Sequence, residues 1–190
     1  MKSTLMNNFI LRWIFYWSAT FCLFILGWKS KGKSPDIKKY ILIAAPHSTN
    51  WDFVFFLLVV FKFKINAHWM GKDTMFRWPF KSLLKRLGGI PVYRSEKANI
   101  VQSLAETFEK SKELIITIAP SGTRKKVVKW KTGFYYLACQ AKVPIVFGFI
   151  DYKRKISGIG PIIEPSGDIN ADMNLIRAFY ADFSGKYPIL

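Results

Sequence analysis

Short apolar runs alternate with stretches of helical period between residues 40 and 163, and this alternation constrains the fold more than any other feature of the chain. The apolar runs, which are typical of buried strands, cover residues 40–45, 65–70, 90–93, 114–119, 144–150 and 159–163. The helix-period stretches cover residues 52–63, 78–87, 97–111 and 132–141, and a last helix is expected within 172–190. Strands that alternate with helices build a parallel sheet with helices on its faces. The sequence therefore predicts an α/β fold with a mixed, largely parallel sheet flanked by helices.

The N-terminal part of the chain has a different character. Residues 9–28 are apolar except for Arg12, Ser18 and Thr20. As a helix they would reach roughly 30 Å, the thickness of the hydrocarbon core of a bilayer. We expect a membrane-associated helix or helical hairpin that either spans the bilayer or lies in one leaflet. Since 190 residues suffice for one sizeable core, we expect an N-terminal membrane-associated segment with a basic linker at 1–35 and one domain at 36–190.

Basic residues dominate the charge of the chain. Lys and Arg total 29 against 12 acidic residues, which gives a formal net charge of +17 and favours polyanionic partners. Aromatic residues make up 17% of the chain and the mean hydropathy is slightly positive, a combination that favours membrane lipids as the partner. No nucleic-acid partner is expected, because the chain has no RNP-like pattern, zinc finger or basic-region helix. Lysines at 29, 31, 33, 38 and 39 follow the apolar segment and predict the cytoplasmic face of the inner or plasma membrane.

Few residues of the chain are suited to metal or disulfide chemistry. Cys22 and Cys139 are the only cysteines, and His47 and His68 are the only histidines. Neither a disulfide framework nor a metal-ligand spacing such as HExxH is present. We therefore expect no protein-held metal and no cofactor.

The first apolar run leads directly into a pair of residues with catalytic potential. In the segment 41–53, ILIAAPHSTNWDF, His47 and Asp52 are five positions apart. Five helical positions turn through roughly 140°, so His47 must precede the helix if the two side chains are to meet. A helix that begins among the good N-cap residues 48–50 would carry Asp52 in its first turn, from which the carboxylate can reach back.

A histidine held in one tautomer by a carboxylate is the base that acyl transfer onto a hydroxyl group needs. The alternative is that Asp52 only complements the positive end of a helix and that His47 is a turn residue.

Basic residues also follow two other apolar runs. Arg94 comes directly after the run at 90–93, at the strand end where open α/β sheets gather ligand groups, and suits a phosphate; the alternative is a solvated charge. Gly122 and Thr123 follow another run as a turn that can aim backbone N–H groups at an anion, and Arg124 adds a full charge. Lysines then alternate with apolar residues over 125–131, which suits either lipid headgroups or a solvated surface.

Taken together, four segments resemble the glycerolipid acyltransferase family, which includes the 1-acyl-glycerol-3-phosphate acyltransferases. Residues 47–52 resemble its H-x4-D motif, and 71–95 resemble the run from a lysine to a G-x-I-P-V-x-R block. Residues 120–124 resemble its P-E-G-T-R block, with Ser121 in place of the glutamate, and 143–145 resemble a V-P-I strand associated with packing behind the site. The resemblance implies that His47 deprotonates the acceptor and that Asp52 orients the histidine. It implies that the substrate is bound by Lys72, Arg94, Ser121, Gly122, Thr123 and Arg124, with the phosphate held by Lys72, Arg94 and Arg124.

The family resemblance also implies an O-acyltransferase of phospholipid biosynthesis or remodelling. The expected reaction moves a fatty acyl group from acyl-CoA or acyl carrier protein, as donor substrate, to the free hydroxyl of a lysophospholipid, with 1-acyl-glycerol-3-phosphate as the expected acceptor. Ser121 leaves open a lipid-binding protein of the same fold that has lost turnover, and another hydroxylated acceptor such as a lyso-aminolipid also stays open. The sequence makes no prediction of the oligomeric state.

Overall fold

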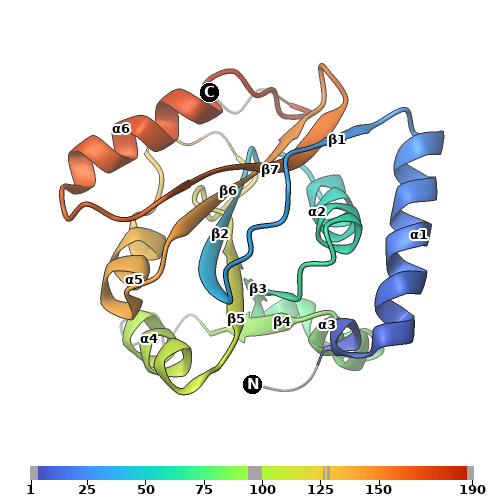
Figure 1. Ribbon diagram of the computed structural model, residues 1–190, viewed down its shortest axis with the longest axis horizontal. Coiled ribbons are helices and arrows are strands. Elements are labelled where there is room, and N and C mark those ends of the chain that lie inside the picture. Colours follow the sequence, from blue (N-terminus) through green and yellow to red (C-terminus); the bar gives the residue numbers. More distant parts are fainter. Residues whose placement is uncertain (1–3, 94–99, 126, 128, 188–190) are drawn as a thin grey trace.

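A seven-stranded sheet runs through the middle of the molecule (Figure 1). The computed structural model describes residues 4–93, 100–125, 127 and 129–187. The strands lie in the order β1 (Lys29–Lys31), β7 (Ile156–Ile163), β6 (Ile145–Asp151), β2 (Lys39–Ala45), β5 (Leu114–Ile118), β3 (Ala67–Lys72) and β4 (Gly89–Val92). Neighbouring strands are parallel except β6 and β7, which are antiparallel. The predicted mixed, largely parallel sheet is confirmed.

Helices cover both faces of this sheet (Figure 1). One face carries α4 (Ile100–Lys110), α5 (Gly133–Ala141) and α6 (Ile169–Tyr180). The other face carries α2 (Trp51–Lys62), and α1 (Phe9–Ile25) packs on the outer side of α2. The remaining short helices are η1 (Leu5–Asn7), η2 (Asp73–Met75) and α3 (Lys81–Arg86).

The central strand β2 is almost entirely apolar after Lys39, and its packing explains why. Ile41 and Ile43 point into the core beneath α4, α5 and α6, whereas Tyr40 and Leu42 point into the core beneath α2. Both faces of this strand are therefore buried, as is typical of parallel sheets covered by helices on both sides. Because β2 ends at Ala45, the residues that follow it emerge at the carboxyl edge of the sheet.

The edge strand β1 was not predicted, because its residues lie in the segment expected to be a basic linker. Its sequence, Lys-Ser-Lys, has no apolar pattern, and it pairs with β7 through backbone hydrogen bonds. The two backbones approach so closely that a Cβ at Gly158 would lie 1.9 Å from the Lys31 carbonyl oxygen. The glycine makes this pairing possible. The division at residue 35 stays a prediction.

The terminal helices differ in extent from the expectation. The N-terminal segment forms the single helix α1 after the one turn of η1. Within the part of the chain that the structure describes, no helix is both long and apolar enough to cross a membrane. The last helix was expected within 172–190 but runs from Ile169 to Tyr180, because Asp168 accepts hydrogen bonds from the first free amides and caps it.

Candidate active site

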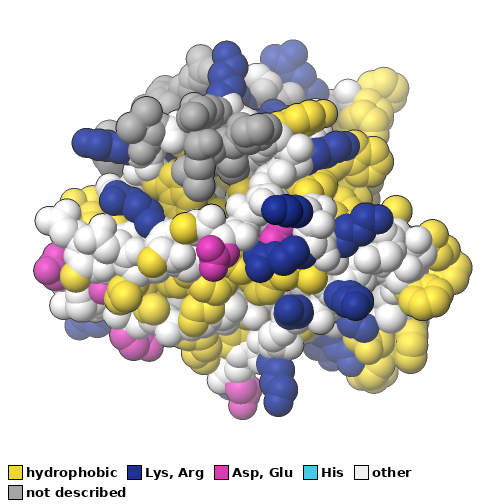
Figure 2. Space-filling model, turned by 90° about the horizontal axis from the view of Figure 1, so that it is seen from above, with side chains coloured by type: hydrophobic (Ala, Val, Ile, Leu, Met, Phe, Trp, Pro, Cys, Tyr) yellow, Lys and Arg dark blue, Asp and Glu magenta, His cyan; other side chains and the backbone are white. Residues whose placement is uncertain are grey.

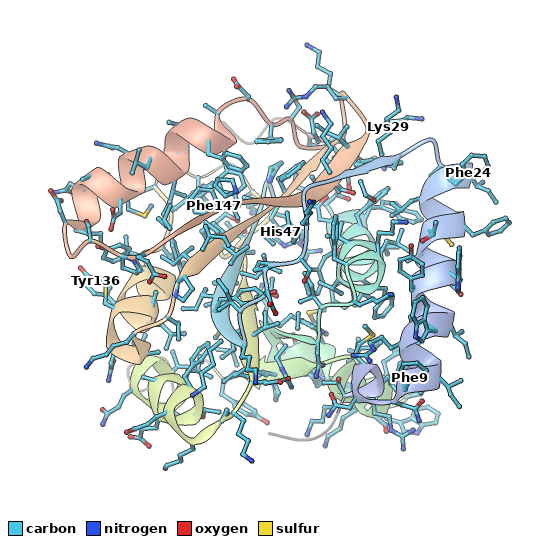
Figure 3. All side chains as sticks on the ribbon, viewed as in Figure 1. Phe9, Phe24, Lys29, His47, Tyr136 and Phe147 are labelled. Atoms are coloured by element: carbon cyan, nitrogen blue, oxygen red, sulfur yellow. The ribbon has the colours of Figure 1, made fainter. Side chains whose placement is uncertain are left out.

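The turn between β2 and α2 brings His47 and Asp52 together. His47 lies in this turn and Asp52 lies in the first turn of α2, as predicted. The Nδ1 atom of His47 is 3.3 Å from Oδ2 of Asp52. His47 is partly exposed between the sheet and α2 (Figure 3), whereas Asp52 is buried. A carboxylate at Nδ1 favours the tautomer with hydrogen on that nitrogen, which leaves Nε2 free to accept a proton.

Asp52 also binds the backbone of the turn that precedes it. Its Oδ2 atom accepts hydrogen bonds from the amides of Ser48, at 2.5 Å, and Thr49, at 2.8 Å. Asn50 occupies the N-cap position, but its side chain forms no capping bond. The two amides precede the helix, so the carboxylate of Asp52 fixes the turn, whereas the first amide of α2, that of Trp51, donates to Oγ1 of Thr49 at 3.4 Å.

The second oxygen of Asp52 has a partner that the sequence analysis missed. Tyr152, in the turn between β6 and β7, donates its hydroxyl to Oδ1 of Asp52 at 2.7 Å. Burial alone would raise the pKa of Asp52. The hydrogen bonds from His47, Tyr152, Thr49 and Ser48 outweigh the burial and hold the pKa of this carboxyl below its usual value. Asp52 is therefore a buried carboxylate that stays ionised.

A cavity of about 290 Å³ opens beside this pair. Most of its wall is apolar and comes from the sheet and α2, including Leu42, Phe53, Phe56, Val59 and Ile159. His47, Asp52 and Arg124 line the same cavity, as do the strand glycines Gly71, Gly148 and Gly158. The imidazole of His47 and the guanidinium of Arg124 therefore both lie in the wall of a mostly apolar cavity.

The predicted turn after β5 reaches this cavity. Gly122 has φ +61°, a backbone conformation that favours glycine, and its amide donates to the Ala119 carbonyl. The hydroxyl of Ser121 donates to the Thr123 carbonyl at 2.8 Å, so the side chain that replaces the family glutamate closes the turn on itself. Arg124 follows and lines the cavity.

Of the other two predicted phosphate-binding residues, the structure describes only Lys72. Lys72 ends β3 and is exposed; its neighbour Gly71 lines the cavity and Lys72 does not. Arg94 lies outside the described residues. Lys131, which the sequence analysis placed only in the basic run, packs its side chain against Gly122 and donates its amide to the Pro120 carbonyl.

The C-terminal segment secures the turn that carries His47. The amide of Lys186 donates to Oγ of Ser48 at 3.0 Å, and the amide of Tyr152 donates to the Ser184 carbonyl at 3.0 Å. The first of these contacts joins residues 138 positions apart, and no local pattern in the sequence signals either contact.

A solved structure resembles this fold. It is the crystal structure of the 1-acyl-sn-glycerophosphate (LPA) acyltransferase, PlsC, from Thermotoga maritima, with a TM-score of 0.61 and 14% sequence identity. The match covers 92% of this chain and 82% of that chain. At this identity the match shows the fold alone.

The family model described as Acyltransferase matches residues 29–147, a range that includes both His47 and Asp52. The chain belongs to the Acyltransferase family and is an acyltransferase. The comparison with curated proteins found no match.

Proposed function

We propose that this acyltransferase moves a fatty acyl group from acyl-CoA or acyl carrier protein to the free hydroxyl of a lysophospholipid, with 1-acyl-glycerol-3-phosphate as the acceptor. One observation carries the proposal. His47 and Asp52, 3.3 Å apart, lie at an apolar cavity that Arg124 also lines. The base can activate the hydroxyl of a lysolipid, the apolar cavity can accept an acyl chain, and the cation can bind a phosphate.

In the proposed mechanism, Nε2 of His47 takes the proton of the acceptor hydroxyl as its oxygen attacks the thioester carbonyl carbon. The resulting tetrahedral intermediate collapses, the carbon–sulfur bond breaks, and the thiolate takes the proton back from the imidazolium. Asp52 stabilises the imidazolium because it stays ionised. No covalent acyl-enzyme is needed.

Phosphate recognition is assigned first to Arg124. No ion pair among the described residues involves Arg124, so its guanidinium is available to an anionic ligand. The neighbouring Ser121 brings no carboxylate into the turn, which leaves the local charge positive. We assign a supporting role in this phosphate site to Lys72, which is exposed beside the cavity-lining Gly71, and to Arg94, with Gly122 and Thr123 supplying the turn.

The exposed face of α1 supports a peripheral position on the membrane surface. Large apolar side chains cover this face at helical spacing: Ile10, Trp13, Ile14, Trp17, Phe21 and Phe24. The opposite face of α1 buries Ala19 and Leu23. Figure 2 shows hydrophobic side chains gathered on the side of the molecule where α1 lies, with Lys and Arg beside them.

Two lysines lie over aromatic rings of this helix. Nζ of Lys64 lies 3.4 Å from the ring centroid of Trp13, and Nζ of Lys62 lies 4.8 Å from that of Tyr16. Aromatic rings beside cations suit the level of anionic lipid headgroups. We place the protein on the cytoplasmic face of the inner or plasma membrane, with lipids as its partner.

The test is an acyl-transfer assay in detergent and in liposomes. Lysophosphatidic acid and a lyso-aminolipid are each offered with acyl-CoA and with acyl carrier protein, to the wild type and to His47→Ala. We expect product from lysophosphatidic acid and a fall of at least about 10³-fold in His47→Ala. His68→Gln, the other histidine of the chain, is the matched control, because His68 does not line the cavity.

Each result has a defined meaning. Near-normal turnover by His47→Ala would refute the mechanism. Product only from the lyso-aminolipid would replace the proposed acceptor. Lysolipid binding without product from any pair would favour the lipid-binding protein that Ser121 suggests.

A further inference from the structure

Both oxygens of Asp52 are engaged, and from different sides. Oδ2 faces Nδ1 of His47 and the amides of Ser48 and Thr49, all within the local turn. Oδ1 faces the hydroxyl of Tyr152, which is 100 positions away in the chain. A carboxylate held at only one oxygen can rotate about its terminal bond, whereas two opposed sets of donors fix its plane.

The ring of Tyr152 is held as firmly as its hydroxyl. Its centroid lies 5.2 Å from that of Trp28, directly after α1, and 5.6 Å from that of Phe55 on α2, both with edge-to-face geometry. The rings of Trp28 and Phe55 also contact each other, at 4.1 Å. Tyr152 therefore lies in an aromatic cluster with Trp28 and Phe55, and its position depends on elements outside the catalytic turn.

Tyr152 does not line the cavity, although its near neighbour Ile150 does. It is thus not placed to touch a substrate. Burial and the adjacent Asp52 charge raise the pKa of Tyr152 far above the range in which enzymes work, so the hydroxyl stays a donor. Among the described residues, the titratable side chains that contact Asp52 are His47 and Tyr152, and Arg124 lines the same cavity.

We propose that Tyr152 is a positioning residue for acyl transfer: it holds Oδ1 of Asp52 so that Oδ2 stays directed at Nδ1 of His47. The inference rests on the proposed function of the His47–Asp52 pair. A role in packing alone would need only a ring at this position, so the hydroxyl group is the part that the proposal concerns.

Tyr152→Phe tests this proposal because it keeps the ring between Trp28 and Phe55 and removes the donor. We expect kcat to fall about tenfold, the scale of a lost hydrogen bond to a charged group, with KM for both substrates within about twofold. The carboxyl carbon resonance of Asp52, followed by NMR as the pH is lowered, should show a raised pKa in the variant, since the lost donor favoured the ionised form.

The chain provides a matched control. Tyr135 on α5 donates its hydroxyl to the buried Asp172 at 2.8 Å, the same type of bond on the opposite face of the sheet. Tyr135→Phe should lower the melting temperature to a similar degree as Tyr152→Phe but leave kcat and the Asp52 titration unchanged.

An unchanged kcat in folded Tyr152→Phe would overturn the proposal, as would a lower kcat without any change in the Asp52 titration. If Tyr152→Phe did not fold, the NMR titration of Asp52 in the wild type would still test the proposal. A pKa of Asp52 at or above the ordinary aspartate value would contradict the hydrogen bond from Tyr152. The His47→Ala assay separates the two proposals. Loss of turnover in His47→Ala with full turnover in Tyr152→Phe would leave the proposed mechanism standing and remove only the role of Tyr152.

Discussion

Phe24→Ala should weaken membrane binding without weakening the fold. Phe24 lies on the outer face of α1 and is 80% exposed, so its ring contributes little to the stability of the folded protein in solution. Complete burial of such a side chain is worth about 1.5 to 3 kcal/mol. Scaled by the 80% that is exposed, insertion into the lipid interface contributes about 1.2 to 2.4 kcal/mol, or about 8- to 60-fold in the partition coefficient.

The assay is co-sedimentation of the purified protein with vesicles of phosphatidylcholine and phosphatidylglycerol, combined with urea unfolding in the absence of lipid. Phe24→Ala should change the free energy of unfolding by less than about 0.5 kcal/mol, as expected for an exposed position. The adjacent Leu23 is 2% exposed and packs toward α2. Leu23→Ala should therefore cost about 2 to 5 kcal/mol of stability and leave the partition coefficient of the folded protein unchanged.

A second control separates this face from exposed aromatic surface in general. Tyr136 on α5 is 56% exposed and lies on the opposite side of the molecule from Phe24 (Figure 3). Tyr136→Ala should bind vesicles as the wild type does. Wild-type binding by Phe24→Ala, or equal loss in Tyr136→Ala, would refute the assignment of α1 as the membrane-facing helix.

Three further outcomes are expected. Arg124→Gln should raise KM for a phosphate-bearing acceptor about tenfold or more, and Lys72→Gln should raise it less because Lys72 is not in the cavity wall; equal effects in steady-state kinetics would count against this ranking. Tyr180→Phe should destabilise the protein by about 1 to 3 kcal/mol in urea unfolding, since its buried hydroxyl bridges two strand carbonyls; no change would show that those carbonyls find other partners. Burial raises and hydrogen bonds lower the pKa of Asp172, with a net shift downward. The ionised carboxyl of Asp172 therefore stabilises the fold above its ordinary pKa of 3.8, and this contribution is lost as the pH falls through its lower pKa in the folded protein. Asp172→Asn should therefore make the free energy of unfolding, measured by urea unfolding at several pH values, depend less on pH at acid pH.

The sequence predicted the strands that have a burial pattern and missed the one that does not. β2, β5 and β6 consist mostly of apolar residues because helices cover both of their faces, and such runs are visible in any single sequence. β1 has no such signal, because a polar edge strand is held by backbone bonds to one neighbour and depends on the glycine at position 158. Its pairing follows from the tertiary structure alone.

In the candidate site, too, the local contact could be predicted from the sequence and the distant one could not. The spacing of His47 and Asp52 predicted a pair on either side of a helix start, and the structure brings the two side chains to 3.3 Å. Tyr152 was beyond prediction, because its hydrogen bond to Asp52 depends on the β6–β7 turn folding back over the start of α2. Sequence periodicity carries no information about a contact of that range.

The structure also gives a physical reason for the spacing between His47 and Asp52. A carboxylate as buried as Asp52 needs several donors to stay ionised, and the turn of 48–50 supplies two of them as backbone amides, which only a substitution by proline would remove. A shorter connection would carry the carboxylate past these amides, and a longer one would separate it from His47. The spacing of five positions therefore both keeps Asp52 ionised and allows it to contact His47. On this argument, insertion of one residue between Thr49 and Asn50 should abolish turnover while all catalytic side chains remain, and a kinetic assay that found normal turnover would show that the turn is dispensable.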